Sequence, residues 1–349
     1  MLLKHLHLQN FRNYSKKVFK FSPTTTLIVG PNTSGKSNLI EAIFFMSNGR
    51  SFRIEKDEQL VKFGAEIARI KSKIGDKELE VVIAKEGVGG RLRPFKKYLV
   101  NGVNKRKVDF VGNFFAVLFA PNDLEIIIGS PFKRRDFIDN ILIQTDRDYR
   151  LAIAFYEKGL RARNALLHRI KETGVRSEKE FAYWDNLLII QGQKITKKRE
   201  TLIEYLKQSK KEILDFAIFY DKSTVSKERL LQYKDAEVGA GVTLVGPHRD
   251  DFILNLKNKT ELHDIKFFGS RGQQRLAILQ LKLLELIFIE QRTGERPVLL
   301  LDDIFSELDE GHINLVLEMI GGQQTILTTT HGEFIPKRLL KELNVIKLF

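Results

Sequence analysis

The sequence predicts an α/β fold in which the two lobes of a sheet-containing head are separated by an inserted α-helical domain. Three observations support this prediction. The first third alternates apolar and polar residues between Gly and Asp turn signals. Residues 133–219 have little Gly or Pro and repeat apolar side chains at a helical period. The last third returns to strands and helices. We expect the head in residues 1–125 and 239–349, and the helical domain in residues 126–238.

The strands of the head are indicated by short apolar segments. Residues 67–74 and 79–84 alternate in part, as half-buried strands do, and residues 26–29 and 114–119 are apolar throughout, as strands buried on both faces are. In the middle of the chain, a seven-residue step joins Phe181, Leu188, Ile195, Leu202 and Phe216. We expect two long helices, packed as an antiparallel hairpin around the polar stretch that contains Gly174.

Composition excludes several classes of protein. The 349 residues are 43% hydrophobic and 29% charged, which excludes a wholly disordered or collagen-like chain. The absence of cysteine excludes disulfides, Cys-ligated zinc, iron–sulfur clusters and thiol chemistry. The N-terminus lacks the apolar core of a signal peptide, and no apolar run approaches the roughly 18–20 residues of a membrane span. We therefore expect a cytoplasmic protein that does not enter a membrane.

Charge indicates the kind of partner. The chain has 58 Lys and Arg residues against 44 Asp and Glu residues, a formal net charge of +14. This excess favours contact with nucleic acid, an acidic protein or an anionic surface, and does not distinguish among them.

One glycine-rich segment matches a phosphate-binding loop at every required position. It reads Gly30, Pro31, Asn32, Thr33, Ser34, Gly35, Lys36 and Ser37. An apolar strand precedes it, and a helical pattern follows from Asn38, which is the context such a loop requires. Backbone amides and the helix N-terminus would bind the phosphates of ATP, with Lys36 on the β- and γ-phosphates and Ser37 on Mg²⁺.

A second apolar strand ends in two carboxylates. Asp302 would hold the metal, and Asp303 would act as the base or orient the attacking water. Lys36 and Asp302 are 266 residues apart, which is far more than a compact nucleoside kinase allows. Such a split head with an inserted helical arm is typical of ABC-type ATPases.

The extra signature of that class is expected before the acidic strand, at the start of a helix. Ser270, Gly272 and Gln273 occupy this place, followed by an apolar helical pattern over residues 276–290. A Ser hydroxyl and a Gly amide at a helix N-terminus can bind an anion. A plain Ser N-cap is the alternative.

These residues, taken together, resemble the RecF family of bacterial recombination-mediator ATPases, which are related to SMC proteins. The resemblance runs along nearly the whole chain. The motifs that carry it are residues 10–14, residues 121–131 followed by Arg134, Arg135 and Asp139, residues 246–251 followed by residues 268–275, and residues 302–309. Residues 246–251 with the signature are specific enough to name the family.

The resemblance implies an ATP-dependent homodimer. Each nucleotide would lie between one subunit's phosphate loop and the other's signature, with Ser306 and Asp309 at the interface. Arg12 would reach the nucleotide, and His331 would stand where a γ-phosphate-sensing histidine is found. Most ABC ATPases carry Glu where Asp303 stands, and the shorter side chain suits a weak, DNA-dependent ATPase that acts as a switch.

RecF-like proteins bind DNA when loaded with ATP, hydrolyse it slowly, and work with RecR and RecO to place RecA on gapped DNA. The resemblance therefore implies a role in recombinational repair and replication-fork maintenance, on double-stranded DNA and single-strand/double-strand junctions.

Two basic clusters are candidate DNA contacts. Residues 158–211 contain 14 basic and 6 acidic side chains, and residues 91–107 contain no acidic residue. The candidates are Arg91, Arg93, Lys96, Lys97, Lys105, Arg106, Lys107, Lys197, Lys198 and Arg199. Their density favours binding of the phosphate backbone with little base readout.

Other functions are weaker alternatives. A P-loop phosphotransferase is disfavoured by the signature and by the long insertion. An SMC-like or nuclease-associated ABC ATPase with another role in DNA maintenance is a second alternative, although 349 residues leave no obvious room for a nuclease domain. A transporter ATPase is disfavoured by the basic insertion.

Overall fold

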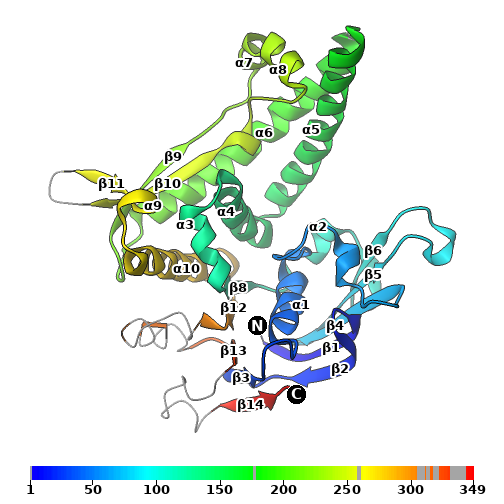
Figure 1. Cartoon of the computed structure of the whole chain (residues 1–349), viewed down its shortest axis with the longest axis vertical. Coiled ribbons are helices and arrows are strands. Elements are labelled where there is room, and N and C mark those ends of the chain that lie inside the picture. Colours follow the sequence, from blue (N-terminus) through cyan, green and yellow to red (C-terminus); the bar gives the residue numbers. More distant parts are fainter. Residues whose placement is uncertain are drawn as a thin grey trace. The chain divides into compact units, whose positions relative to one another are not determined.

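The computed structural model describes residues 2–175, 178–257, 261–304, 311, 315–316, 322–330 and 343–349. The chain divides into two compact units, of which the second is inserted into the first (Figure 1). Unit 1 is Met1–Asp123 with Leu279–Phe349, and unit 2 is Leu124–Ile278. Unit 2 thus continues beyond the boundary at residue 238 that we expected from the sequence.

Unit 1 contains an antiparallel sheet in the order β2-β1-β4-β5-β6-β7. Its strands are β1 (Leu3–Phe11), β2 (Tyr14–Lys20), β4 (Ile67–Ile74), β5 (Lys77–Ala84), β6 (Phe95–Val100) and β7 (Val103–Lys105). Alternation along β1 buries Leu6 and Leu8 and leaves His5 and Gln9 on the other face. The 3-10 turn η1 (Asp57–Leu60) precedes β4, η2 (Val88–Gly90) lies in the hairpin between β5 and β6, and the short helix α2 (Lys107–Phe110) follows β7.

A second, parallel sheet of unit 1 has the order β14-β3-β13-β12-β8. Its strands are β3 (Thr25–Val29), β8 (Ala116–Phe119), β12 (Val298–Asp302), β13 (Thr325–Thr329) and β14 (Asn344–Lys347). Helix α1 (Lys36–Asn48) packs on β8, β12 and β13 and also contacts β5. Because the strands are parallel, the loop after β3 and the carboxylates at the end of β12 emerge at the same sheet edge.

Unit 2 is built on a helical hairpin. Its helices are α3 (Glu125–Ile128), α4 (Pro131–Thr145), α5 (Arg147–Thr173), α6 (Glu178–Gln208), α7 (Lys227–Gln232), α8 (Lys234–Ala240) and α9 (Ile265–Phe268). The 3-10 turn η3 (Pro121–Leu124) leads from unit 1 into unit 2, and η4 (Pro247–Arg249) precedes β10. The long helices α5 and α6 pack along each other, which confirms the predicted hairpin. Gly159 allows their close approach, because a Cβ there would lie 3.2 Å from Leu187.

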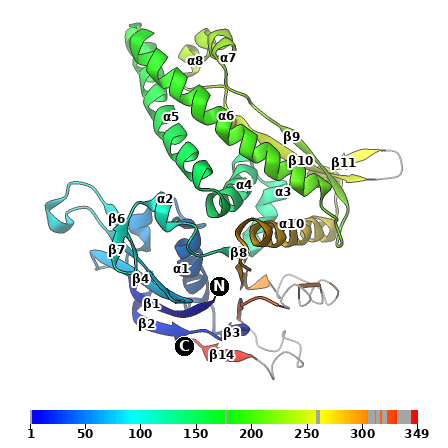
Figure 2. The same ribbon diagram turned by 180° about the vertical axis from the view of Figure 1, so that it is seen from behind.

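The predicted heptad step was wrong at its C-terminal end. Helix α6 ends at Gln208, and Phe216 begins strand β9 (Phe216–Asp221), where it pairs with Leu256. Strand β9 runs beside α6 in an antiparallel sheet with β10 (Asp251–Lys257) and β11 (Leu262–Asp264) (Figure 2). Helix α10 (Arg271–Thr293) continues from unit 2 into unit 1. None of the helices that the structure describes has the length and apolar character needed to cross a membrane.

Candidate functional site

The loop between β3 and α1 has a backbone that only certain residues adopt. Gly35, which directly precedes α1, has a φ of 102° and brings no side chain to the helix N-terminus. A Cβ at this position would lie 2.7 Å from the hydroxyl of Tyr14. Gly30 is confined as well, since its Cβ would meet Leu348 O at 2.8 Å. The two glycines of the motif are therefore required by conformation and by close packing.

Lys36 points back over this loop. Its side chain is 6% exposed, and Nζ donates to Gly30 O at 2.7 Å and to Pro31 O at 3.0 Å. Burial lowers the pKa of Lys36, and the charges of Asp303 and Asp302 oppose that shift. The ammonium is thus held where the loop would enclose a phosphate.

Ser37 and Asp302 bring two hard oxygen atoms together from segments far apart in the sequence. Ser37 Oγ donates to Asp302 Oδ1 at 3.1 Å, and Thr328 Oγ1 donates to the same oxygen at 2.8 Å. Burial raises the pKa of Asp302, against the effect of these two hydrogen bonds. A hydroxyl beside a buried carboxylate fits Mg²⁺, whose charge would stabilise the ionised form. This is the pair that the sequence analysis predicted as metal ligands.

Asp303 lies directly after the strand in a left-handed conformation, with a φ of 52°. Its backbone N–H donates to Thr328 O at 3.2 Å and to Thr328 Oγ1 at 3.0 Å. Thr328 therefore holds the carboxylate of Asp302 and the backbone of Asp303. Thr328 was not predicted from the sequence, because a Thr in a buried strand carries no motif of its own.

Arg12 of the N-terminal motif is bonded to Glu41 and Gln59. Its Nε and Nη2 donate to the two oxygens of Glu41 at 2.8 and 2.7 Å, and Nη1 donates to Gln59 O at 3.1 Å. Glu41 is fully buried on α1. Arg12 thus fixes the N-terminal motif to α1, and its predicted contact with the nucleotide stays a prediction.

Four other polar side chains lie beside the loop. Tyr14 Oη donates to Gly35 O at 3.1 Å, and Asn38 bridges Asn13 (2.9 Å) to Arg53 (3.1 Å). Arg53 was not predicted, since no motif marks it. Its positive charge is one of the effects that oppose the rise in the pKa of Asp302 caused by burial.

The signature forms a reciprocal N-cap at the start of α10. Ser270 Oγ accepts from the N–H of Gln273 at 3.2 Å, and Gln273 Oε1 accepts from the N–H of Ser270 at 2.9 Å. Ser270 is exposed, and Gly272 has space around it, the nearest atom to its Cβ being 3.9 Å away. The N-cap alternative is confirmed for this structure, and the exposed helix N-terminus is also open to an anion.

Ser306, Asp309 and His331 lie outside the described residues. Their predicted roles at the nucleotide and the subunit interface stay predictions.

The other family motifs of unit 2 form a buried polar network. Arg199 donates to Asp139 at 2.8 Å and to Asp250 at 2.9 Å, and it bonds to Pro247 O at 2.6 Å. Arg134 forms a bidentate pair with Asp251, at 2.6 and 2.9 Å. This network joins α4, α6 and the start of β10.

His248 belongs to the same network. Its Nε2 faces Thr243 O at 3.0 Å, and since a carbonyl only accepts, Nε2 carries the proton; Nδ1 then accepts from Tyr156 Oη at 2.8 Å. Burial lowers the pKa of His248 to about 4. These motif residues thus hold unit 2 together and do not present themselves to a ligand.

The candidate DNA contacts separate into exposed and occupied side chains. Arg199 is only 3% exposed and bound by carboxylates, so the prediction that it contacts DNA was wrong. Lys96 is paired with Asp57, Arg106 with Asp109 and Lys198 with Asp146, while Lys107 is half-buried. The exposed candidates are Arg91, Arg93, Lys97, Lys105 and Lys197, and Arg106 is exposed as well in its surface pair with Asp109.

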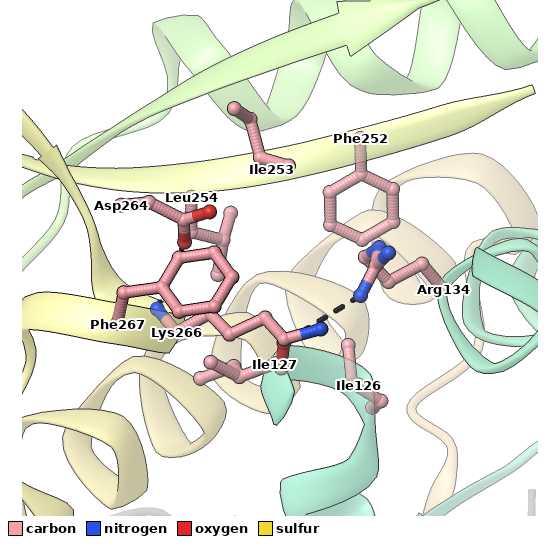
Figure 3. A pocket seen from close by; sticks show the side chains of 9 residues that line it. All are labelled: Ile126, Ile127, Arg134, Phe252, Ile253, Leu254, Asp264, Lys266 and Phe267. Atoms are coloured by element: carbon pink, nitrogen blue, oxygen red, sulfur yellow. Dashed lines mark hydrogen bonds between the residues drawn. The ribbon is translucent and has the colours of Figure 1, made fainter. Parts of the chain in front are cut away.

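A pocket in unit 2 does not suit a nucleotide. It has a volume of about 180 Å³. Most of its lining side chains are apolar, and the charged side chains of Arg134, Asp264 and Lys266 complete the lining (Figure 3). This volume is below the roughly 300–1,000 Å³ typical of ligand sites. The guanidinium of Arg134 is already bound by Asp251 and by Gly129 O at 3.0 Å.

Comparison with known proteins relates this geometry to a family. The model of the RecF/RecN/SMC N terminal domain matches residues 2–341. The DNA replication and repair proteins RecF of Moorella thermoacetica and Caldanaerobacter subterraneus subsp. tengcongensis are each 36% identical to this chain. These alignments cover 99% and 95% of this chain, respectively, and 94% of each relative.

Solved structures agree. One described as the recombination mediator protein RecF-ATPrS in the RecFOR pathway superposes with a TM-score of 0.86 at 34% identity, covering 100% of this chain and 96% of its own. A RecF-ATP structure gives 0.84 at 34% identity, covering 96% and 93%. The Smc head domain of Pyrococcus furiosus shares the fold alone, with a TM-score of 0.50 at 17% identity, covering 99% and 92%.

Proposed function

The chain belongs to the RecF family, with the ABC-type ATPase head of the RecF/RecN/SMC group, and on this premise we propose that it is an ATP-gated DNA-binding protein of recombinational repair and replication-fork maintenance. The observation that carries the proposal is the meeting of Ser37 with Asp302 beside the buried Lys36. That arrangement places a cation, a hydroxyl and a carboxylate around a loop of phosphate-binding form.

At the nucleotide, each side chain has a distinct task. The loop amides and Lys36 bind the phosphates of ATP, and Ser37 and Asp302 hold Mg²⁺, which neutralises phosphate charge when bound. Asp303, fixed by its backbone bonds to Thr328, orients the attacking water and accepts its proton. Because the side chain of Asp303 is one methylene shorter than that of Glu, it reaches the water less well and hydrolysis is weak. This slow hydrolysis, which DNA stimulates, serves as a timer.

The second half of the site comes from another copy of the chain. The exposed N-terminus of α10, with Ser270, Gly272 and Gln273, contacts the γ-phosphate held by the partner's loop. ATP therefore joins two subunits, and the dimer clamps DNA with its exposed basic side chains. Hydrolysis separates the subunits and releases DNA. RecR and RecO are the proposed partners in supporting RecA on gapped DNA, in the cytoplasm.

The test is DNA affinity as a function of nucleotide and salt. With ATP, we expect binding to tighten and its logarithm to fall linearly with the logarithm of salt concentration, as counterions leave the phosphates. Without nucleotide, or with ADP, binding should weaken at every salt concentration. An affinity that is the same with ATP, with ADP and without nucleotide would rule out the gated clamp.

A further inference from the structure

The hairpin between β5 and β6 of unit 1 ends in an exposed apolar residue between two arginines. Residues 90–93 read Gly-Arg-Leu-Arg, followed by Pro94. Leu92 is 87% exposed, and Arg91 and Arg93 are exposed as well. An exposed leucine does not stabilise the folded monomer. Burying a side chain of this size contributes about 1.5–3 kcal/mol, and only when water is excluded from it.

The loop stands clear of the rest of unit 1. A Cβ added at Gly87, Gly89 or Gly90 would meet no atom within 4 Å. The loop is shaped by its own turn bonds, from Gly87 N to Arg91 O at 2.9 Å and from Gly90 N to Gly87 O at 3.2 Å. It therefore presents Leu92 on a formed turn.

Arg91 is aligned with a basic face of the antiparallel sheet. Its guanidinium lies 4.4 Å from the centre of the Phe95 ring. Phe95 and Lys97 alternate with the inward-facing Lys96 and Tyr98, so they share the outer face of β6.

The register extends this face across the sheet. Lys97 is opposite Val82, Val82 opposite Arg69, Arg69 opposite Gln9 and Gln9 opposite Lys16. Directly opposed residues lie on the same face of a sheet. One row thus carries Lys16, Arg69, which is paired with Glu80 of β5 at 2.9 Å, and Lys97. The hairpin extends from the ends of β5 and β6 in the same sheet.

We infer that this hairpin is a DNA wedge: the basic face and the two arginines hold the phosphate backbone while Leu92 inserts between base pairs. This inference rests on the proposed DNA binding and adds the element that selects the DNA structure. Apolar wedges flanked by basic residues unstack base steps at a cost of a few kcal/mol per step. Because that cost is least where stacking is already interrupted, the wedge favours a single-strand/double-strand junction over continuous duplex.

The experiment uses the full chain with ATP and two DNA probes that differ only in a gap. Each carries 2-aminopurine at the same base step, which lies beside the junction in the gapped probe. We expect wild-type protein to raise the 2-aminopurine fluorescence of the gapped probe and to bind it more tightly. Leu92→Ser should lose this signal and lower the ratio of affinity for the gapped probe to affinity for the continuous probe by up to about tenfold. The slope of the logarithm of DNA affinity against the logarithm of salt concentration should stay unchanged. Arg91→Ala should reduce that slope by about one.

Val103→Ser is the matched control, since Val103 is an aliphatic residue, 56% exposed, on β7 of the same sheet. It should leave every readout unchanged. If Leu92→Ser keeps the fluorescence signal and the preference for the gap, the wedge is wrong, while ATP-dependent binding by the wild type would still support the proposed function. If the wild type binds neither probe with ATP, the proposed function and the wedge both fail.

Discussion

At the scale of single residues, Lys36 and Asp302 have opposite responses to burial. Burial lowers the pKa of Lys36 and raises the pKa of Asp302. The charges of the two aspartates oppose the shift at Lys36, and hydrogen bonds from Ser37 and Thr328 oppose the shift at Asp302. Both charged forms are therefore costly without a ligand. Bound phosphate and Mg²⁺ would supply the missing charges, which makes the site suited to act as a switch.

Lys36→Met should remove nucleotide binding. The substitution keeps the length of the side chain but deletes the donor that faces Gly30 O and Pro31 O. Since hydrogen bonds to charged groups are worth about 1.5–3 kcal/mol each, we expect ATP affinity to fall by at least about tenfold, measured with a fluorescent ATP analogue. Lys20→Met, at the exposed end of β2, is the control and should bind normally. Retained affinity in Lys36→Met would exclude the phosphate role.

At the scale of elements, the buried network of unit 2 makes Arg199 a structural residue. Arg199→Met should destabilise the protein by about 3–5 kcal/mol, because it leaves Asp139 and Asp250 as buried carboxylates without their cation. Urea unfolding measures this. Lys197→Met, on the exposed side of the same helix, should change stability by less than about 0.5 kcal/mol. Equal stability of the two variants would contradict the assignment.

His248 gives the same network a pH dependence. Burial lowers its pKa from 6.5 to about 4. Between these values the unfolded chain binds a proton that the folded chain does not, so stability falls as the pH falls, by roughly 1 kcal/mol per pH unit. We expect the Tm to decrease from pH 6.5 to 4.5 more steeply in the wild type than in His248→Gln, which keeps a donor for Thr243 O. Parallel Tm profiles would show that His248 is not the group responsible.

The sequence predicted elements well where the pattern is local. The alternation of residues 67–74 gave β4 with its observed bounds, and the phosphate loop follows from its motif. The pattern failed at Phe216, because the seven-residue step continues past the end of α6 while the pairing partner of β9 lies in β10. The predicted site was incomplete because Thr328 and Glu41 act through contacts between distant segments, which a local pattern does not reveal. They are identified only by their contacts with Asp302 and Arg12.

At the scale of the whole molecule, the count of 58 Lys and Arg residues overstates the number of cations available to DNA. Arg134, Arg163 and Arg199 are buried and paired with carboxylates in unit 2, and Lys36 belongs to the phosphate loop. The exposed remainder is distributed over both units. Binding of DNA by such a surface depends on joining modest basic areas, which is what an ATP-bound dimer would do.

Ser270→Arg tests that dimer. Ser270 belongs to unit 2 and the phosphate loop to unit 1, so each subunit should still bind ATP. The arginine adds bulk and a positive charge at the positive end of α10, which should exclude the partner's nucleotide and prevent association. Sedimentation velocity with ATP measures this association. Ser270→Ala is the control, because it loses the same cap, at about 0.5–2 kcal/mol, without adding bulk or charge. If Ser270→Arg dimerises with ATP as the wild type does, the N-terminus of α10 is not part of the shared site.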